Sequence, residues 1–225
     1  MQRTIYHGSS QIVRIPRFNT GTASNDYGSG FYCTENSDIA SEWAVSSRSD
    51  GFVNRYTIET NGLRILNLNS PEYCILHWLS VLLSHREFDA CDSSVYQARE
   101  YIRANFSVDT RSCDCVIGFR ADDCNYLFAQ SFLDGDISYR QFNDAVRLND
   151  TGRQFVIKSK RAFDRMLFNG YTVARSSDYC PAVAARDRQA MQRFFGSLSA
   201  PDSRDMYISQ IVSRQIQPYD TQLKW

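Results

Sequence analysis

The sequence lacks the residues that most protein metal sites require. It has only three histidines, His7, His77 and His85, and its seven cysteines form no Cys-x-x-Cys pair. An odd number of cysteines also argues against a complete set of disulfides. We therefore expect no bound metal, and thiols that are reduced and mostly buried, as in a cytosolic protein.

A net charge is also lacking. The chain has 25 basic and 25 acidic side chains, so its formal net charge is zero. Such a chain has no overall field that would draw it to phosphate backbones or to anionic lipid. The composition therefore gives no sign of a nucleic-acid-binding or membrane-surface protein.

Long hydrophobic runs are absent as well. The first fifteen residues contain no apolar core of a signal peptide. The longest apolar stretch, residues 74–83, is interrupted by His77 and Ser80 and is too short to span a bilayer. We expect a soluble, unprocessed, cytoplasmic chain with no membrane partner.

What the sequence does contain is a mixture of strand and helix patterns over 225 residues, enough chain for a substantial core. Residues 19–30, rich in Gly, Ser, Asn and Asp, predict an irregular loop. Alternating or β-branched segments predict strands at 3–7, 31–34, 52–58, 63–68, 115–119, 154–158 and 171–174. Helical periodicity and capping residues predict helices at 37–48, 75–83, 95–102, 121–132, 139–148 and 161–167. The fold class is therefore α+β.

The chain becomes helical and polar beyond Pro181, where helices are expected around residues 186–195 and 206–213. We predict one domain over residues 1–178, containing a helical insert at 72–106, and a helical C-terminal appendage over 179–225.

Two ordered motifs carry the chemistry. Tyr6-His7-Gly8-Ser9 ends the first predicted strand, and Tyr27-Gly28-Ser29-Gly30-Phe31-Tyr32 enters the second. Trp43 follows eleven positions after Tyr32. Splitting NAD at its nicotinamide bond needs backbone groups for the carboxamide, aromatic rings to stack on nicotinamide, and a polar group beside the ribose. These motifs offer residues of each kind.

The motifs, together with Gln154-Phe155-Val156-Ile157, resemble those of the His-Tyr-Glu class of ADP-ribosyltransferases, which includes the poly(ADP-ribose) polymerases and diphtheria toxin. More closely, the chain resembles an uncharacterised bacterial family with that fold and with glutamine in place of the catalytic glutamate. The resemblance implies split antiparallel sheets around an NAD cleft, with NAD as substrate and no metal.

The same resemblance implies the role of each residue. His7 would bind the adenosine ribose, Gly8 would hold the nicotinamide amide through its backbone, and Ser9 would assist. Tyr32 and Trp43 would stack on both faces of the nicotinamide ring. Tyr27 and Gly30 would complete the NAD-binding set, and the catalytic set would be His7, Tyr32 and Gln154.

Gln154 departs from the family pattern, in which a glutamate stands at this place. A neutral amide accepts the ribose hydrogen bond but adds no negative charge beside the developing cation. Losing one electrostatic stabiliser costs about 10²–10³ in rate. Chain elongation is therefore disfavoured, whereas transfer of a single ADP-ribose unit, slow hydrolysis and binding without catalysis stay open.

Each of these residues also has an ordinary structural explanation. A histidine at a strand end commonly bonds to a neighbouring carbonyl, and glycines such as Gly28 and Gly30 commonly serve only a turn. Trp43 fits a core position of its helix as well as a stacking position. Tyr27 fits either an anchor of the loop or an aromatic lid over the ligand.

The expected function is mono-ADP-ribosylation of a macromolecular acceptor, protein or nucleic acid, by a bacterial toxin, effector or phage-defence component. Alternatives are an NAD glycohydrolase and a non-catalytic NAD or ADP-ribose-binding module. A cognate antitoxin or regulatory partner is expected to bind through the C-terminal helices.

Overall fold

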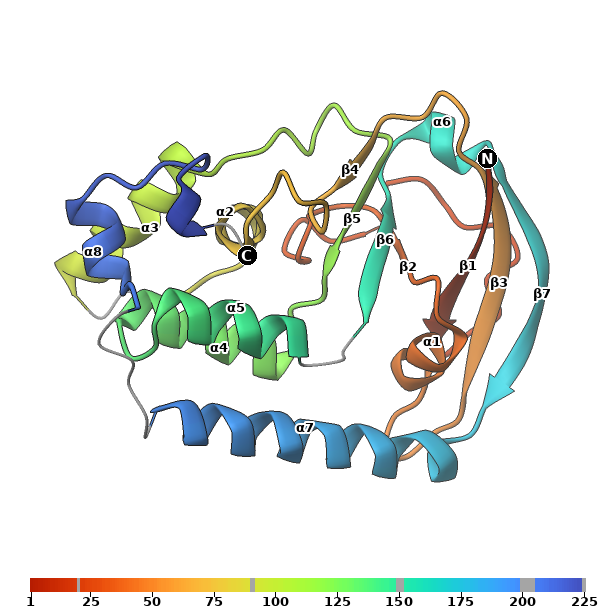
Figure 1. Ribbon diagram of the computed structural model, residues 1–225. Helices are drawn as coiled ribbons and strands as arrows, with labels where there is room; N and C mark the ends of the chain where they lie inside the picture. Colours follow the sequence, from red (N-terminus) through yellow and green to blue (C-terminus); the bar gives the residue numbers. More distant parts are fainter. Residues whose placement is uncertain (20, 90–91, 149–151, 199–204, 224–225) are drawn as a thin grey trace. The chain divides into compact units, whose positions relative to one another are not determined.

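The computed structural model describes residues 1–19, 21–89, 92–148, 152–198 and 205–223, which form helices and two β-sheets (Figure 1). The α+β fold class is thereby confirmed. Contacts group the chain into two compact units, each assembled from three segments. Unit 1 consists of Met1–Asn67, Asp109–Gly118 and Thr151–Arg186. Unit 2 consists of Leu68–Val108, Phe119–Asp150 and Asp187–Trp225.

The first sheet of unit 1 is antiparallel, in the order β1-β3-β7. Strand β1 covers Gln2–Ser9, β3 covers Gly51–Glu59 and β7 covers Met166–Ala174. Its central strand pairs with β1 from Gln2↔Glu59 to Ser9↔Phe52 and with β7 from Gly51↔Ala174 to Ile58↔Met166. The strand pattern of the sequence predicted β1 and β3 closely.

Two predictions for residues 160–174 were wrong in their bounds, one for a helix and one for a strand. The helix expected at residues 161–167 is the shorter α6, Lys160–Phe163, which begins where Ser159 Oγ accepts a hydrogen bond from the Ala162 amide. The strand expected at residues 171–174 starts earlier than predicted, at Met166, and ends at Ala174 as predicted. A register shift in its pairing with β3 and the positive φ of Gly170, 106°, interrupt the alternation that would have revealed its full length.

The second sheet of unit 1 has the order β2-β6-β5-β4. Its strands are β2 (Phe31–Cys33), β6 (Arg153–Ile157), β5 (Cys115–Phe119) and β4 (Ile65–Asn67). The first two pair antiparallel, but β4 and β5 pair parallel, so the expectation of two antiparallel sheets is wrong for this pair. The chain between β4 and β5 is long and contains helices, and a crossover of this kind is what a parallel pair requires.

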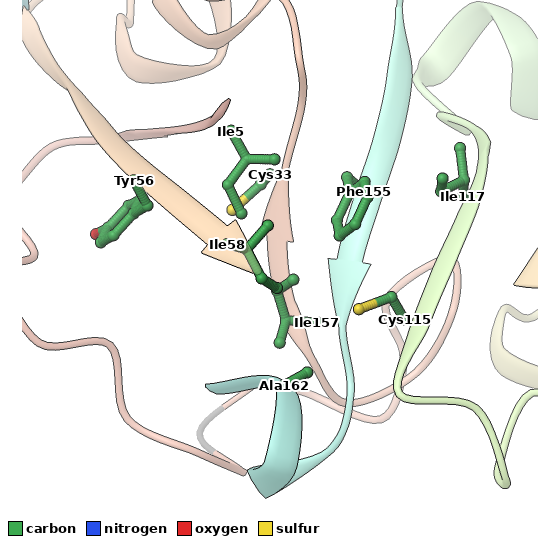
Figure 2. Close-up of a cluster of buried hydrophobic side chains, with 9 residues drawn as sticks. All are labelled: Ile5, Cys33, Tyr56, Ile58, Cys115, Ile117, Phe155, Ile157 and Ala162. Atoms are coloured by element: carbon green, nitrogen blue, oxygen red, sulfur yellow. The ribbon is translucent and has the colours of Figure 1, made fainter. Parts of the chain in front are cut away.

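A core of apolar side chains lies between these two sheets (Figure 2). The first sheet contributes Ile5, Tyr56 and Ile58, and the second contributes Cys33, Phe155 and Ile157. All six are at most 1% exposed. Burial on this scale is the main force that holds the two sheets of unit 1 together.

Helix α1, Ser37–Ala44, covers the other face of the first sheet. Asn36 caps it, with its side-chain oxygen accepting hydrogen bonds from the Asp38 and Ile39 amides. Buried Ala40 and Ala44 pack with Val53 of β3 and Ala174 of β7. The helix ends four residues before the predicted Arg48, because Ser46 and Ser49 form a turn stabilised by two backbone hydrogen bonds.

Unit 2 is helical. It contains α2 (Ile75–His85), α3 (Ser93–Asn105), α4 (Asp123–Asp134), α5 (Tyr139–Leu148) and α8 (Ile208–Ser213). A single 3₁₀ turn, η1, covers Thr221–Leu223. The first two helices lie inside the predicted insert at 72–106. The insert therefore packs with later helices as part of one larger unit.

The predicted boundary between residues 178 and 179 falls inside a helix. Helix α7 runs from Ser176 to Leu198 and includes Pro181. Asp50 starts it by accepting a hydrogen bond of 2.8 Å from the Ser176 amide. The division into 1–178 and 179–225 thus differs from the two compact units. Pro181 does not end α7, which continues to Leu198.

No helix in the described part of the chain is long and apolar enough to cross a membrane.

Candidate functional site

The first motif and the strand of the second motif meet at a backbone bridge. Tyr6 in β1 and Thr34 after β2 exchange two hydrogen bonds, of 2.7 Å and 2.9 Å. Because backbone groups alternate direction along an antiparallel strand, the N–H and C=O of Gly8 point to the same side as those of Tyr6, away from β3. The backbone of Gly8 is thus directed towards the edge of β1 from which β2 diverges.

His7 joins the two motifs directly. Its Nδ1 lies 2.7 Å from the carbonyl oxygen of Tyr32, and its ring packs on Phe31 with 4.3 Å between centroids. A carbonyl only accepts, so Nδ1 carries the hydrogen and Nε2 of the neutral ring is an acceptor. An imidazole fixed in this tautomer can accept a hydrogen bond from a sugar hydroxyl.

Burial lowers the pKa of His7 from its usual value of 6.5, and the bond to Tyr32 opposes that shift only in part. Burial lowers the pKa of His77 in the same way. Both rings are therefore neutral at pH 7 in the folded chain. This neutral form leaves the Nε2 lone pair of His7 available.

These two shifts predict a pH dependence of stability. Below pH 6.5 the unfolded chain binds protons that the folded chain resists, so the free energy of unfolding should fall with acidification, by up to about 1.4 kcal/mol per pH unit for each histidine. Urea unfolding between pH 7.5 and 5.5 measures this fall. His7→Gln should make the dependence shallower, and an unchanged slope would contradict the assignment.

Gly8 is required by the packing of helix α1. A Cβ added to Gly8 would lie 2.0 Å from the Ala40 carbonyl oxygen and 2.8 Å from the Ala44 amide nitrogen. The space beside its Cα is thus filled by the helix, and only its backbone edge remains for a ligand. The close approach that the structure shows at Gly8 is that of α1, and the predicted approach of a ligand to its backbone stays a prediction.

Trp43 lies beside this glycine, since its Cβ is 3.0 Å from the position of the added atom. Its side chain is half-buried, and the tryptophan is not among the fully buried residues of the core. Helix α1 therefore brings Trp43 next to the His7-Gly8 pair. The stacking role expected for its ring stays a prediction.

Tyr32 anchors the glycine loop. Its hydroxyl donates a 2.6 Å hydrogen bond to the Gly28 carbonyl and accepts a 3.0 Å bond from the Tyr27 amide. Its ring is half-buried, on the face of the sheet opposite the buried neighbours Cys33 and Phe155. Tyr32 therefore keeps partial exposure while fixing the loop that precedes it.

Tyr27 is placed as the anchor of this loop. Its side chain is 0% exposed and packs against Gly118 of β5, where an added Cβ would lie 2.0 Å from the tyrosine oxygen. Lys158 donates a hydrogen bond to its carbonyl. A fully buried ring offers no face to a ligand, so Tyr27 is left out of the contacts proposed below.

Gly30 also serves packing. An added Cβ would lie 2.6 Å from Val156 Cγ1 and 3.0 Å from the Ile157 carbonyl oxygen. The glycine lets the loop run close along β6 just before β2 begins. Its predicted contact with NAD stays a prediction.

Ser9 ends β1, and its hydroxyl accepts a 3.2 Å hydrogen bond from the Gln11 amide. The next stretch of chain is held by Asn54, a residue that the sequence analysis missed. This side chain is 0% exposed, accepts from the Val13 amide at 2.8 Å, and donates to the carbonyls of His7 and Gln11. The sequence could have indicated this role, because Asn54 is a polar residue next to Val53 in a predicted strand, and a buried amide needs hydrogen-bond partners.

Gln154 shares its sheet face with Tyr32. Tyr32 pairs with Val156 and Cys33 with Phe155, so the next register position sets Thr34 opposite Gln154. The side chain of Gln154 is 6% exposed, and its Oε1 has no hydrogen-bond partner among the described residues. A buried amide oxygen without a partner is costly unless a ligand or water supplies a donor.

A cavity of about 280 Å³ adjoins this glutamine. Its described lining comprises Thr34, Glu35, Asn36, Ile117, Gly152, Arg153, Gln154 and Phe155. Most of these side chains are polar and only Glu35 and Arg153 are charged. The cavity suits a small hydroxyl-bearing or amine-bearing group.

The cysteines that the structure describes are free thiols. Cys33, Cys115 and Cys124 are buried, whereas Cys74, Cys113 and Cys180 are half-buried. In the described ranges no three His, Cys, Asp or Glu side chains gather where they could hold a metal ion.

The model of one protein family matches this chain. The family is described as "Protein of unknown function (DUF3990)", and the match covers residues 3–168. The chain therefore belongs to this family. No curated protein and no solved structure matches it.

Proposed function

Because the family to which the chain belongs has no assigned function, we propose one from the site itself: the protein is a mono-ADP-ribosyltransferase that transfers ADP-ribose from NAD to a macromolecular acceptor. The observation that carries the proposal is the junction of the two motifs. His7 is bonded to the Tyr32 carbonyl at 2.7 Å, and Trp43 lies beside Gly8. These contacts bring residues distant in sequence near one another, and this proximity supports the proposal.

Under this proposal each group has one task. The outward backbone of Gly8 binds the nicotinamide carboxamide, and Nε2 of His7 accepts from the adenosine ribose. The rings of Tyr32 and Trp43 stack on nicotinamide. Gln154 accepts a hydrogen bond from the ribose on which the C1′–N bond breaks, a use that would satisfy its buried Oε1.

The test is incubation of the protein and a cell lysate with NAD labelled in its adenylate part. Label is then read separately on protein, on nucleic acid and as free ADP-ribose. Transfer predicts label on a macromolecule. Free ADP-ribose alone would favour the glycohydrolase, and unchanged NAD would contradict both enzymes.

A non-catalytic NAD-binding or ADP-ribose-binding module is the second candidate, favoured by the neutral amide of Gln154. Gln154→Glu distinguishes the two. A carboxylate here contributes about 10²–10³ in rate where nothing else supplies the charge, so an enzyme should release nicotinamide at least tenfold faster. Nicotinamide release measured by chromatography reports this gain. Absence of release from both the wild type and the variant, with NAD still bound, would favour the binding module.

A further inference from the structure

The cavity beside Gln154 is also lined by a carboxylate, that of Glu35. Gln154 itself is neutral and adds no negative charge to this cavity. Glu35 follows Thr34, the residue opposite Gln154 in the register, and both Glu35 and Gln154 line the cavity of about 280 Å³. Among the described residues of this lining, Glu35 is the only acidic one. The site thus holds one buried neutral amide and one carboxylate.

The surroundings leave Glu35 available to a ligand. Its side chain is 49% exposed and pairs with Arg3, whose Nη1 lies 3.0 Å from Oε1. Ion pairs with this much solvent contact are weak and readily rearranged. The neighbouring polar residue Asn36 is occupied as the cap of α1, and the Thr34 hydroxyl accepts a 3.2 Å hydrogen bond from the Asn36 amide.

We infer that Glu35 supplies the carboxylate for ADP-ribosyl transfer that a glutamate supplies in the His-Tyr-Glu class of ADP-ribosyltransferases, at the place where this chain has Gln154. This inference rests on the proposed function and names a further catalytic residue for it. The division of labour is that Gln154 orients the ribose by hydrogen bonding, while Glu35 provides negative charge and takes a proton.

The chemical step balances with these groups alone. The bond from ribose C1′ to the nicotinamide nitrogen breaks, and its electron pair neutralises the ring nitrogen. The positive charge that remains on C1′ and the ring oxygen is stabilised by the Glu35 carboxylate. A hydroxyl or amine of the acceptor then bonds to C1′, and its proton passes to Glu35.

The experiment measures NAD affinity by calorimetry and nicotinamide release for the wild type, Glu35→Gln, Gln154→Glu and the double variant. Glu35→Gln should lower the rate about 10²-fold and leave the NAD dissociation constant within about threefold. Gln154→Glu should raise the rate about tenfold in the wild type but about 10²-fold in the Glu35→Gln background, because the two carboxylates serve one purpose.

Two control variants separate charge at the cavity from loss of an ion pair. Glu100 pairs with Arg103 at 2.9 Å and is 47% exposed, so Glu100→Gln removes an almost identical pair from helix α3. Its rate should match the wild type. Arg3→Gln breaks the same pair as Glu35→Gln but keeps the carboxylate, and it should retain turnover.

Each other outcome overturns the inference. Glu35→Gln with turnover within threefold of the wild type, or a loss equally large in Arg3→Gln, would show that the carboxylate does not act. A wild type that binds NAD without releasing nicotinamide would overturn both this inference and the proposed transferase, and only NAD binding would stand. The two outcomes named first require turnover by the wild type, so they overturn the inference alone and leave the proposed function in place.

Discussion

Tyr32→Ala is expected to weaken NAD binding by about 10²-fold or more. Under the proposed function the substitution removes a ring that stacks on nicotinamide, and the stacking of a base on an aromatic side chain contributes roughly 1–3 kcal/mol in single-stranded nucleic-acid sites. It also removes the hydroxyl that bonds to the Gly28 carbonyl and the Tyr27 amide. Since about 2.7 kcal/mol corresponds to 10²-fold, loss of both contributions reaches this size. Isothermal titration calorimetry of the full chain measures the change.

Two further variants divide the effect of Tyr32. Tyr32→Phe keeps the ring and removes only the bonds of the hydroxyl, so its affinity should lie between those of the wild type and Tyr32→Ala. His7→Ala should weaken binding about tenfold through one lost hydrogen bond. Tyr96, 59% exposed in α3, gives a matched control whose replacement by alanine should leave the affinity unchanged. Unchanged affinity in both Tyr32→Ala and His7→Ala would place NAD elsewhere or nowhere on this chain.

The sequence was sufficient for most individual elements because local patterns determine them. The strand pattern of residues 52–58 predicted β3, in which buried and less buried positions alternate except at Val53 and Asn54, and the asparagine before residues 37–44 predicted the start of α1. The fold class followed from these elements. The ends were less accurate where tertiary pairing extends a strand, as in β7, whose first half pairs with β3 across a register shift.

Non-local features could not be predicted from local patterns. The parallel direction of β4 and β5 depends on where the intervening chain returns, and no residue in either strand encodes that path. The two units are each built from three separated segments, an arrangement that a single boundary between residues 178 and 179 does not describe. Pro181 lies within α7, which continues past it to Leu198 although a proline inside a helix removes one backbone hydrogen bond.

In the candidate site, too, some features could be predicted from the sequence and others depend on distant parts of the chain. The order of the two motifs indicated which residues would come together, and the bond from His7 to Tyr32 brings the motifs into contact. The sequence left Tyr27 between two roles, and burial against Gly118 distinguishes them. The bonds of Asn54 and the place of Glu35 at the cavity were missed, because both depend on neighbours contributed by other strands.

Gly8→Ala is expected to destabilise the protein by about 3 kcal/mol. The new methyl group would overlap the Ala40 carbonyl oxygen and the Ala44 amide nitrogen, which are backbone atoms and cannot turn away as a side chain does. Helix α1 must then shift from β1. Trp43 moves with it, so NAD affinity should fall even in the fraction that stays folded. Urea unfolding of the full chain measures the loss of stability.

Gly196→Ala supplies the matched control, because it adds the same methyl group within helix α7 with no atom within 4 Å. Alanine in a helix is favoured over glycine by about 0.5–1 kcal/mol, so this variant should be slightly more stable than the wild type. The two substitutions add the same methyl group, but Gly8→Ala is predicted to lower the free energy of unfolding and Gly196→Ala to raise it. If Gly8→Ala were as stable as the control, α1 would not lie against β1, and the position of Trp43 beside the glycine would lose its basis.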